Sequence, residues 1–217
     1  MFSIASLQSG RPLKVLCIGC HSDDIEIGCG GTILQLLCNN STLEFTWMVF
    51  SSGGSEREKE ARECAVLFLE KAKKKDVIVK DFRDGFFPFE GAKIKSVFEE
   101  ELKRCAPDIV FTHNRRDAHQ DHRTVADLTW NTFRNHLILE YEIPKYDGDL
   151  GQPNCFVPLP QEIYTRKVDC LMKAFRTQQD KRWFEPATFM ALMRLRGMEC
   201  NAPSGYAEAF YCRKMVL

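Results

Sequence analysis

The 217-residue sequence lacks an excess of charge of either sign and lacks any long hydrophobic run. Lys and Arg together number 30, and so do Asp and Glu, so the formal net charge is zero. Proteins that bind nucleic acids usually carry a basic excess or patch, so we expect no nucleic-acid partner. No stretch approaches the roughly 18 continuous apolar residues of a membrane span, so we expect no transmembrane segment.

The N-terminus lacks the features of a secretory signal peptide, because no basic region is followed by a long apolar one. The sequence also lacks a second CxxC pair to complete a four-cysteine zinc site with Cys17 and Cys20. Its ten cysteines are scattered among apolar residues, and free cysteine behaves as a small buried hydrophobe. We therefore expect a reduced, cytoplasmic protein.

Segments typical of strands and helices alternate along the chain. Apolar and alternating patterns predict strands at 13–19, 43–50, 77–82 and 108–112. Helical spacing predicts helices at 28–37, 55–72, 92–104 and 121–135. This alternation implies βαβ units, and we predict an α/β fold: a Rossmann-like three-layer αβα sandwich with a mainly parallel sheet. The length fits a single domain spanning residues 1–217.

The pattern changes after Tyr141. Residues 143–160 contain four prolines and two glycines. A loop this long in a compact domain is often a lid or substrate loop, with a plain connection as the alternative. A further helix is predicted at 161–177 and a late strand at 208–215.

Two short motifs hold three of the five histidines: His21-Ser22-Asp23-Asp24 and His119-Gln120-Asp121-His122. A catalytic zinc ion takes about three protein ligands from His and Asp or Glu and leaves a position open for water. That water also needs a nearby base. Each motif follows a predicted strand, and the carboxyl ends of parallel strands meet at one edge of a sheet. The sequence therefore predicts one metal site built from both motifs.

Spacing leaves the roles within the first motif open. His21 and Asp24 can face one point across a turn and bind a metal, with Asp23 close by. For a single aspartate, capping of the following helix is a strong alternative.

In the second motif, His119 and His122 share one face at the start of a helix. Asp117 and Asp121 are placed to orient a ring by accepting its second N–H group. We expect His113 to cap the fourth strand.

The motifs resemble the signatures of a known family. HSDDIEIGCGGTI resembles the "HPDDE…GGT" signature of the LmbE-like/PIG-L family of zinc-dependent N-acetylglucosamine deacetylases, and DAHQDHR resembles its "HxDH" signature. The helix that begins near Arg57 and the turn at Asp84 also match family positions. The similarity covers residues 13 to about 130 well and extends more loosely to 206–210.

The resemblance implies a role for each site residue. The implied metal ligands are His21, Asp24 and His122, the implied catalytic residues are Asp23, His119 and Asp121, and the implied sugar contacts are Arg57 and Asp84. Asp23 would act as the general base, and protonated His119 would stabilise the transition state. One Zn²⁺ per chain is implied, although the same ligands suit another divalent metal.

The sequence departs from the family signature at two positions. Ser22 replaces the usual proline, so the turn is less constrained. Ile25 stands where the family often has Glu, and Glu26 follows one position later. Both changes bear on how the loop packs and which sugar fits, and neither alters an implied ligand.

The implied reaction removes the N-acetyl group from an N-acetylglucosamine-type sugar and releases acetate. The small-molecule substrate stays open among nucleotide-linked, lipid-linked, thiol-glycoside and antibiotic sugars, and a homo-oligomer is compatible with the sequence. One alternative is a non-catalytic zinc-binding protein of the same fold. The other is a nucleotide-binding oxidoreductase, because Gly28-Cys29-Gly30-Gly31 superficially resembles a dinucleotide loop; in that motif position 33 would be glycine, and it is Ile33.

Overall fold

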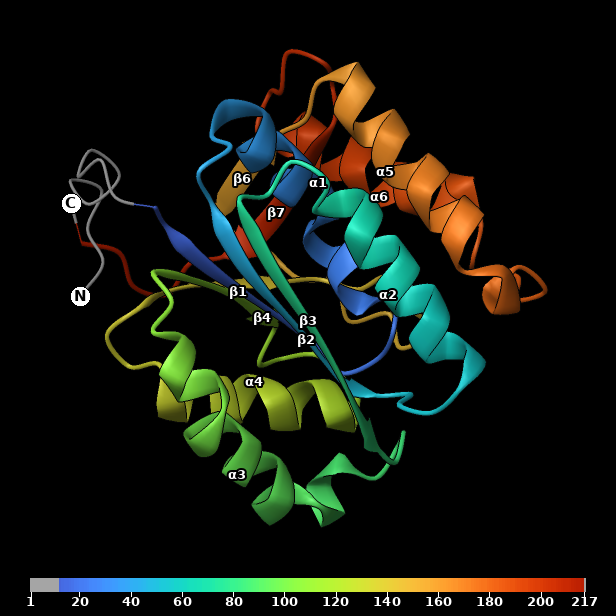
Figure 1. Ribbon diagram of the computed structural model, residues 1–217. Coiled ribbons are helices and arrows are strands. Elements are labelled where there is room, and N and C mark those ends of the chain that lie inside the picture. The colour runs from blue at the N-terminus through green and yellow to red at the C-terminus, as the bar shows by residue number, and fades with distance from the viewer. Residues whose placement is uncertain (1–11, 217) are drawn as a thin grey trace.

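A seven-stranded sheet forms the middle layer of the molecule (Figure 1). The structure is a computed structural model that describes residues 12–216. The strands are β1 (Lys14–Gly19), β2 (Glu44–Ser51), β3 (Lys74–Phe82), β4 (Ile109–His113), β5 (Leu137–Tyr141), β6 (Cys155–Pro158) and β7 (Ala207–Tyr211). Their order is β3-β2-β1-β4-β5-β7-β6; the first five run parallel, and β7 is antiparallel to both its neighbours. The predicted α/β fold with a mainly parallel sheet is confirmed.

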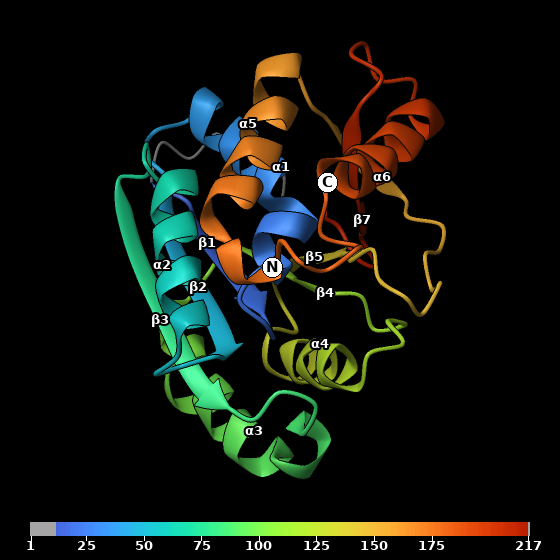
Figure 2. The same cartoon turned by 90° about the vertical axis from the view of Figure 1, so that its right-hand side faces the viewer.

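Helices cover both faces of the sheet (Figures 1 and 2). One face carries α1 (Asp24–Asn39), α2 (Glu56–Phe68) and α5 (Gln161–Ala174), which pack against one another. Helix α6 (Pro186–Glu199) packs on β7 and α5, and its buried residues belong to the core of this first face. The other face carries α3 (Gly91–Glu100) and α4 (Gln120–Thr132). Within residues 12–216 there are also three short 3-10 helices: η2 (Phe87–Phe89), η3 (Leu102–Cys105) and η4 (Arg176–Gln178). Among residues 12–216, no helix combines the length and apolarity needed to cross a bilayer.

The core is divided in two by the sheet, as the alternation of side chains along a strand requires. Val15 and Cys17 of β1 belong to the core beneath α1, α2 and α5. Leu16 and Ile18 belong to the core on the side of α3 and α4. Each of these four side chains is essentially inaccessible to solvent, so β1 is buried on both faces.

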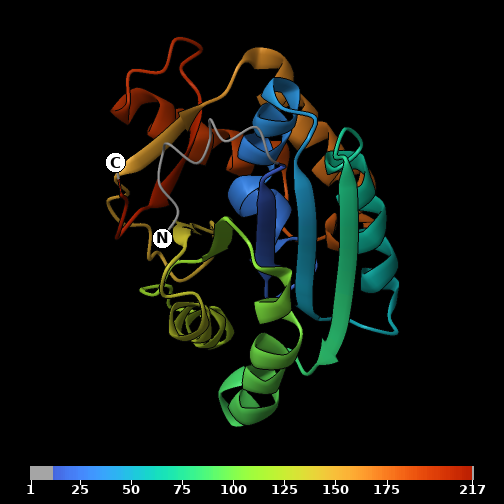
Figure 3. The ribbon, with the colours of Figure 1, turned by 60° about the vertical axis from the view of Figure 1, so that its left-hand side comes forward.

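The chain order reverses between β1 and β4. From β1 the chain proceeds outward to β2 and β3, which run side by side in Figure 3, and β4 then pairs with the opposite edge of β1. Ligands of open α/β sheets bind in the crevice at the carboxyl ends of the strands beside such a reversal. The first motif follows β1 directly and the second follows β4, so the topology brings both to that crevice.

Several element boundaries differ from the predicted ones. Helix α1 begins at Asp24, four residues before the predicted start, so the first motif runs into its first turn. The predicted helix at 92–104 is divided into α3 and η3, and Ala106 then adopts a left-handed conformation with φ of 44°. The predicted helix at 161–177 ends at Ala174 and is followed by η4.

Strands β5 and β6 and helix α6 were not predicted from the sequence. The prediction that 143–160 is an irregular loop was wrong for β6, which pairs with β7 over residues 155–158 in spite of the neighbouring prolines. An edge strand tolerates proline because one side of it needs no ladder hydrogen bonds.

The glycines of the GCGG run lie inside α1 and not in a loop before it. A β-carbon on Gly28 would lie 2.2 Å from the Tyr141 ring, and one on Gly31 would lie 2.5 Å from Leu159. These glycines therefore allow close packing of α1 on the sheet. This placement removes the basis of the dinucleotide-loop alternative, which needs the glycines in the turn between strand and helix.

Replacing Gly28 with alanine is expected to destabilise the protein by about 1–3 kcal/mol, because the added methyl group overlaps the buried Tyr141 ring. Tyr141 cannot move freely, since its hydroxyl donates a 2.6 Å hydrogen bond to Ile18 O. Denaturant unfolding measures the effect. Gly91→Ala is the matched control, because nothing lies within 4 Å of a β-carbon there. Equal stability of the two variants would contradict this packing.

Candidate active site

Three side chains from the two motifs converge at the carboxyl ends of β1 and β4. His21 Nδ1 lies 3.2 Å from His122 Nε2 and 3.3 Å from Asp24 Oδ2, and the third separation, His122 Nε2 to Asp24 Oδ2, is 3.6 Å. Ligands bound tetrahedrally at about 2.0–2.1 Å are separated by roughly 3.3–3.4 Å. The three atoms therefore fit the corners of a zinc coordination tetrahedron, and the predicted ligands are brought together.

The charges around the three atoms also favour a cation. Burial lowers the pKa of His21, but the carboxylates of Asp24 and Asp121 outweigh this effect and the net pKa is raised well above its usual value. For His122, burial and the neighbouring His113 lower the pKa to about 4, so this ring is neutral at neutral pH and can donate a lone pair. The first position attracts positive charge, and the second presents a neutral donor.

The Asp117 carboxylate orients the His122 ring through the ring nitrogen Nδ1. Asp117 Oδ2 lies 2.9 Å from His122 Nδ1, which is the arrangement that fixes a metal-binding histidine in the correct tautomer. Lys145 Nζ lies 3.0 Å from the same oxygen, and Asp117 Oδ1 accepts a 2.8 Å hydrogen bond from His119 N. Of the two aspartates that the sequence offered for this position, the structure places Asp117 there.

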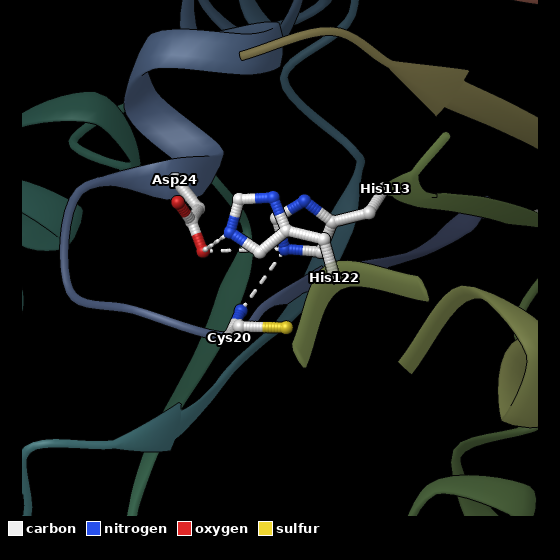
Figure 4. A group of neighbouring side chains, drawn as sticks. All are labelled: Cys20, Asp24, His113 and His122. Atoms are coloured by element: carbon white, nitrogen blue, oxygen red, sulfur yellow. Dashed lines mark hydrogen bonds and ion pairs between the residues drawn. The ribbon is translucent and has the colours of Figure 1, made fainter. Parts of the chain in front are cut away.

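His113 belongs to this site, which the sequence analysis did not foresee. Its ring stacks on His122 with centroids 3.8 Å apart, and its Nε2 lies 3.2 Å from Asp24 Oδ2 (Figure 4). Cys20, Asp24, His113 and His122 form a second, fully buried group able to hold a metal. Burial and the nearby Asp24 raise the pKa of the Cys20 thiol well above its usual value, which disfavours the thiolate that binds zinc. The set with His21 is the more suitable one, because its open side faces solvent.

Asp23 lies close enough to His21 and Asp24 for their charges to shift the pKa of its carboxyl group. It occupies the N-cap position of α1 without a capping hydrogen bond, and its Oδ1 lies 3.0 Å from Arg57 Nη2. Burial raises the pKa of Asp23, the positive charge of Arg57 lowers it, and the negative charge of Asp24 raises it further. The net result is a raised pKa. The capping alternative for this aspartate is therefore wrong, and its carboxylate is available for proton transfer.

His119 caps α4 through its ring. Its Nδ1 accepts a 3.2 Å hydrogen bond from Asp121 N. An imidazole that accepts at Nδ1 has Nε2 as its donor nitrogen, so this contact orients the ring with Nε2 as the donor.

The two remaining predicted aspartates lie on the other side of His21. Asp84 Oδ1 is 3.0 Å from His21 Nε2, and Asp121 Oδ2 is 3.5 Å from it. Asp121 is fully buried and accepts backbone hydrogen bonds from Gly85 (2.7 Å) and Phe87 (3.1 Å). Asp121 therefore fixes the turn that carries the exposed Asp84.

An open cleft of about 340 Å³ leads to these residues. It falls in the size range of small-molecule sites. It is lined by His21, Asp23, Asp24, Ser52, Arg57, Asp84, His119, His122, Ile143, Pro144, Lys145, Tyr146, Asp147, Gln178, Lys181 and Trp183. The wall formed by 143–147 comes from the predicted substrate loop, whereas the wall formed by 178–183 was not predicted. No pattern in the sequence distinguishes that second segment from an ordinary connection.

Metal binding is expected to strengthen as pH rises through neutrality. The raised pKa of His21 means that the metal-free ring holds a proton below that value, and a metal must displace it. In the unfolded chain the pKa of a histidine is about 6.5, so below that pH the raised pKa of His21 stabilises the folded metal-free protein. This stabilisation is lost as pH rises through the raised pKa of His21. Calorimetric zinc titrations at pH 7 in two buffers of different protonation enthalpy should give release of about one proton. Binding without proton release would mean that His21 is already neutral.

The fold and the site together define a metal-dependent hydrolase. A family model described as PIG-L, GlcNAc-PI de-N-acetylase, matches residues 16–133. The chain belongs to this family, and it is a deacetylase of it, as the resemblance predicted.

Known proteins of similar sequence or fold agree with this assignment. The "uncharacterized deacetylase YaiS" of Escherichia coli (strain K12) is 28% identical over 180 residues, which cover 78% of this chain and 95% of the relative. N,N'-diacetylchitobiose deacetylase from Pyrococcus horikoshii superposes with a TM-score of 0.70 at 22% identity, over 91% of this chain and 82% of that one. GalB, a 4-carboxy-2-hydroxymuconate hydratase from Pseudomonas putida, superposes with a TM-score of 0.73 at 15% identity, over 94% and 98%. The two structures show a common fold with different reactions, so the site has to decide the chemistry.

Proposed function

We propose that this protein is a zinc-dependent hydrolase that removes the acetyl group from an N-acetylglucosamine-type sugar or glycoside. The observation that carries the proposal is the spacing of 3.2–3.6 Å between ring and carboxylate atoms of His21, Asp24 and His122, with the carboxylate of Asp23 beside them. The name of the family model and the diacetylchitobiose substrate of one relative of the same fold support a sugar amide.

The proposed metal is held by His21, Asp24 and His122. A zinc ion bound there would lower the pKa of a water molecule and polarise the acetamide carbonyl. The remaining chemistry falls to side chains of the chain itself.

Asp23 acts as the general base that takes a proton from the attacking water and then delivers one to the departing amine. A pKa raised by burial suits this task, because a base works best when its pKa approaches the working pH. His119, with its proton on Nε2, donates a hydrogen bond to the developing oxyanion.

Arg57 and Asp84 bind the sugar. Arg57 lines the cleft and is held in place by its ion pair with Asp23, so its guanidinium is positioned beside a sugar bound there. Asp84 is largely exposed at the mouth of the cleft. Asp121 supports catalysis indirectly by holding the Asp84 turn and the His119 ring.

The test is an acetate-release screen of the zinc-loaded protein against N-acetyl sugars that differ in their anomeric group. Release from at least one sugar, with loss of release after chelation and recovery on adding zinc, is the expected result. Metal-loaded protein that releases no acetate from any of them would overturn the proposal and favour the non-catalytic alternative. Hydration of an unsaturated acid in place of deacetylation would favour the reaction of the hydratase relative.

A further inference from the structure

We propose that residues 177–183 form a subsite for the group attached to the sugar, and that this group is acidic. The inference rests on the proposed function and extends it to the substrate class. The segment joins α5 to α6 and contributes Gln178, Lys181 and Trp183 to the cleft that contains the predicted metal ligands. Residues 143–147 also line this cleft.

The segment is fixed in place by a buried carboxylate. Glu60 of α2 is inaccessible to solvent, and its two oxygens accept hydrogen bonds from Thr177 N (2.8 Å) and Thr177 Oγ1 (2.7 Å). Gln178 Nε2 donates to the same hydroxyl at 3.1 Å. A buried carboxylate that uses both oxygens on one residue holds that residue firmly, so the wall is built before substrate arrives.

The aromatic part of the wall is equally supported. Trp183 is half-buried, and its ring packs edge-on against Phe184 with centroids 5.4 Å apart. Phe184 is itself buried in the core beneath α5 and α6. Trp183 therefore presents part of a rigid ring to the cleft, as aromatic residues at binding surfaces commonly do.

The charge of the wall comes from Lys181. The other two cations that line the cleft are paired: Arg57 with Asp23, and Lys145 with Asp117 and Asp149. Lys181 forms no ion pair with any residue between 12 and 216. An unpaired ammonium that lines the same cleft as a fixed indole suits a carboxylate or phosphate carried by the group attached to the sugar.

Asp147 is the charge that opposes such a ligand. It is an exposed carboxylate that lines the same cleft. Opposite effects are therefore expected at the two residues, since removing Lys181 should weaken binding of an acidic group and removing Asp147 should strengthen it.

The experiment compares the methyl and carboxymethyl glycosides of N-acetylglucosamine, matched in anomeric configuration, as substrates of the zinc-loaded full chain. Lys181→Met should raise KM for the carboxymethyl glycoside about fivefold and leave kcat for that glycoside unchanged. For the methyl glycoside, neither kcat nor KM should change. Asp147→Asn should lower KM for the carboxymethyl glycoside alone. Arg182→Met is the matched control, because Arg182 is the neighbouring exposed cation and does not line the cleft.

Equal changes for the two glycosides would overturn the subsite, because they would show loss of general packing at the rim. An effect of Arg182→Met as large as that of Lys181→Met would also overturn the subsite, because the cause would then be the total positive charge of this surface and not a contact made by Lys181. If neither glycoside releases acetate, the proposed function fails, and calorimetric binding then decides the subsite. In that case tighter binding of the carboxymethyl glycoside that depends on Lys181 supports the acidic subsite, and equal binding of both glycosides rejects it.

Discussion

Replacing His122 with alanine is expected to cost the protein its metal and, with it, nearly all deacetylase activity. His122 Nε2 is one of three atoms spaced for a single ion, and the ring is held by Asp117 with almost no exposure to solvent. Zinc sites of four ligands bind with roughly 10–16 kcal/mol, so loss of one ligand should weaken binding roughly 10²–10³-fold. Competition with a chromophoric chelator measures this loss, and metal analysis of the purified variant should show the site largely empty.

The matched control for this variant is His136→Ala. His136 lies before β5, at the end of the strand away from the cleft, and does not line it. This variant should retain zinc binding within a factor of two, roughly the effect of a surface change. Full metal retention by His122→Ala would exclude both the proposed ligand set and the buried group with Cys20, because His122 belongs to each, and would favour the group of His21, Asp84, His119 and Asp121.

The convergence of the two motifs could be predicted from the sequence because each motif is local. His21 and Asp24 are close in sequence after a strand whose apolar pattern is clear, and His119 and His122 share one helical turn. Parallel-sheet topology then brings the two halves together without any knowledge of side-chain packing. The distinction between Asp23 and Asp24, by contrast, came from the family resemblance. The two carboxyl groups differ in their pKa, which burial raises for Asp23 and the neighbouring histidines lower for Asp24.

The parts of the site that were missed depend on contacts between residues distant in sequence. His113 looked like the end of a strand, and its role is visible only once its ring is stacked on His122. Lys145 comes from a proline-rich loop and reaches Asp117 across the cleft. The wall at 177–183 is positioned by Glu60, a residue of α2 that reads in the sequence as part of a charged helix surface.

The fold shows the same division between local and non-local information. Strands β1 to β4 have strong apolar patterns and were predicted within a few residues. Strand β6 is short, flanked by prolines and made stable by pairing with β7, which the local sequence does not encode. Helix α6 begins with Pro186 and carries exposed apolar residues such as Met198, so its amphipathic pattern is weak.

Replacing Asp23 with asparagine is expected to keep the metal and lower kcat by roughly 10²–10⁴-fold, the usual contribution of a general base. Asparagine has nearly the same shape, and its oxygen can still accept the 3.0 Å contact from Arg57, but it cannot take a proton. The measurement is acetate release from a sugar that the native protein hydrolyses, together with zinc content. A loss of zinc in this variant would show that Asp23 belongs to the ligand set.

The pH profile separates a base from a residue that only shapes the cleft. Because burial and the Asp24 charge raise the pKa of Asp23, native activity should be lost as pH falls through a value above the ordinary range of an aspartate. The asparagine variant has no such group, so its residual activity should lack that acid limb. Asp147→Asn removes another carboxylate from the cleft wall and should leave both kcat and the acid limb intact for a neutral glycoside. Near-native turnover by Asp23→Asn with full zinc content would exclude Asp23 as the base and transfer that role to another carboxylate of the cleft, of which Asp84 is nearest to His21.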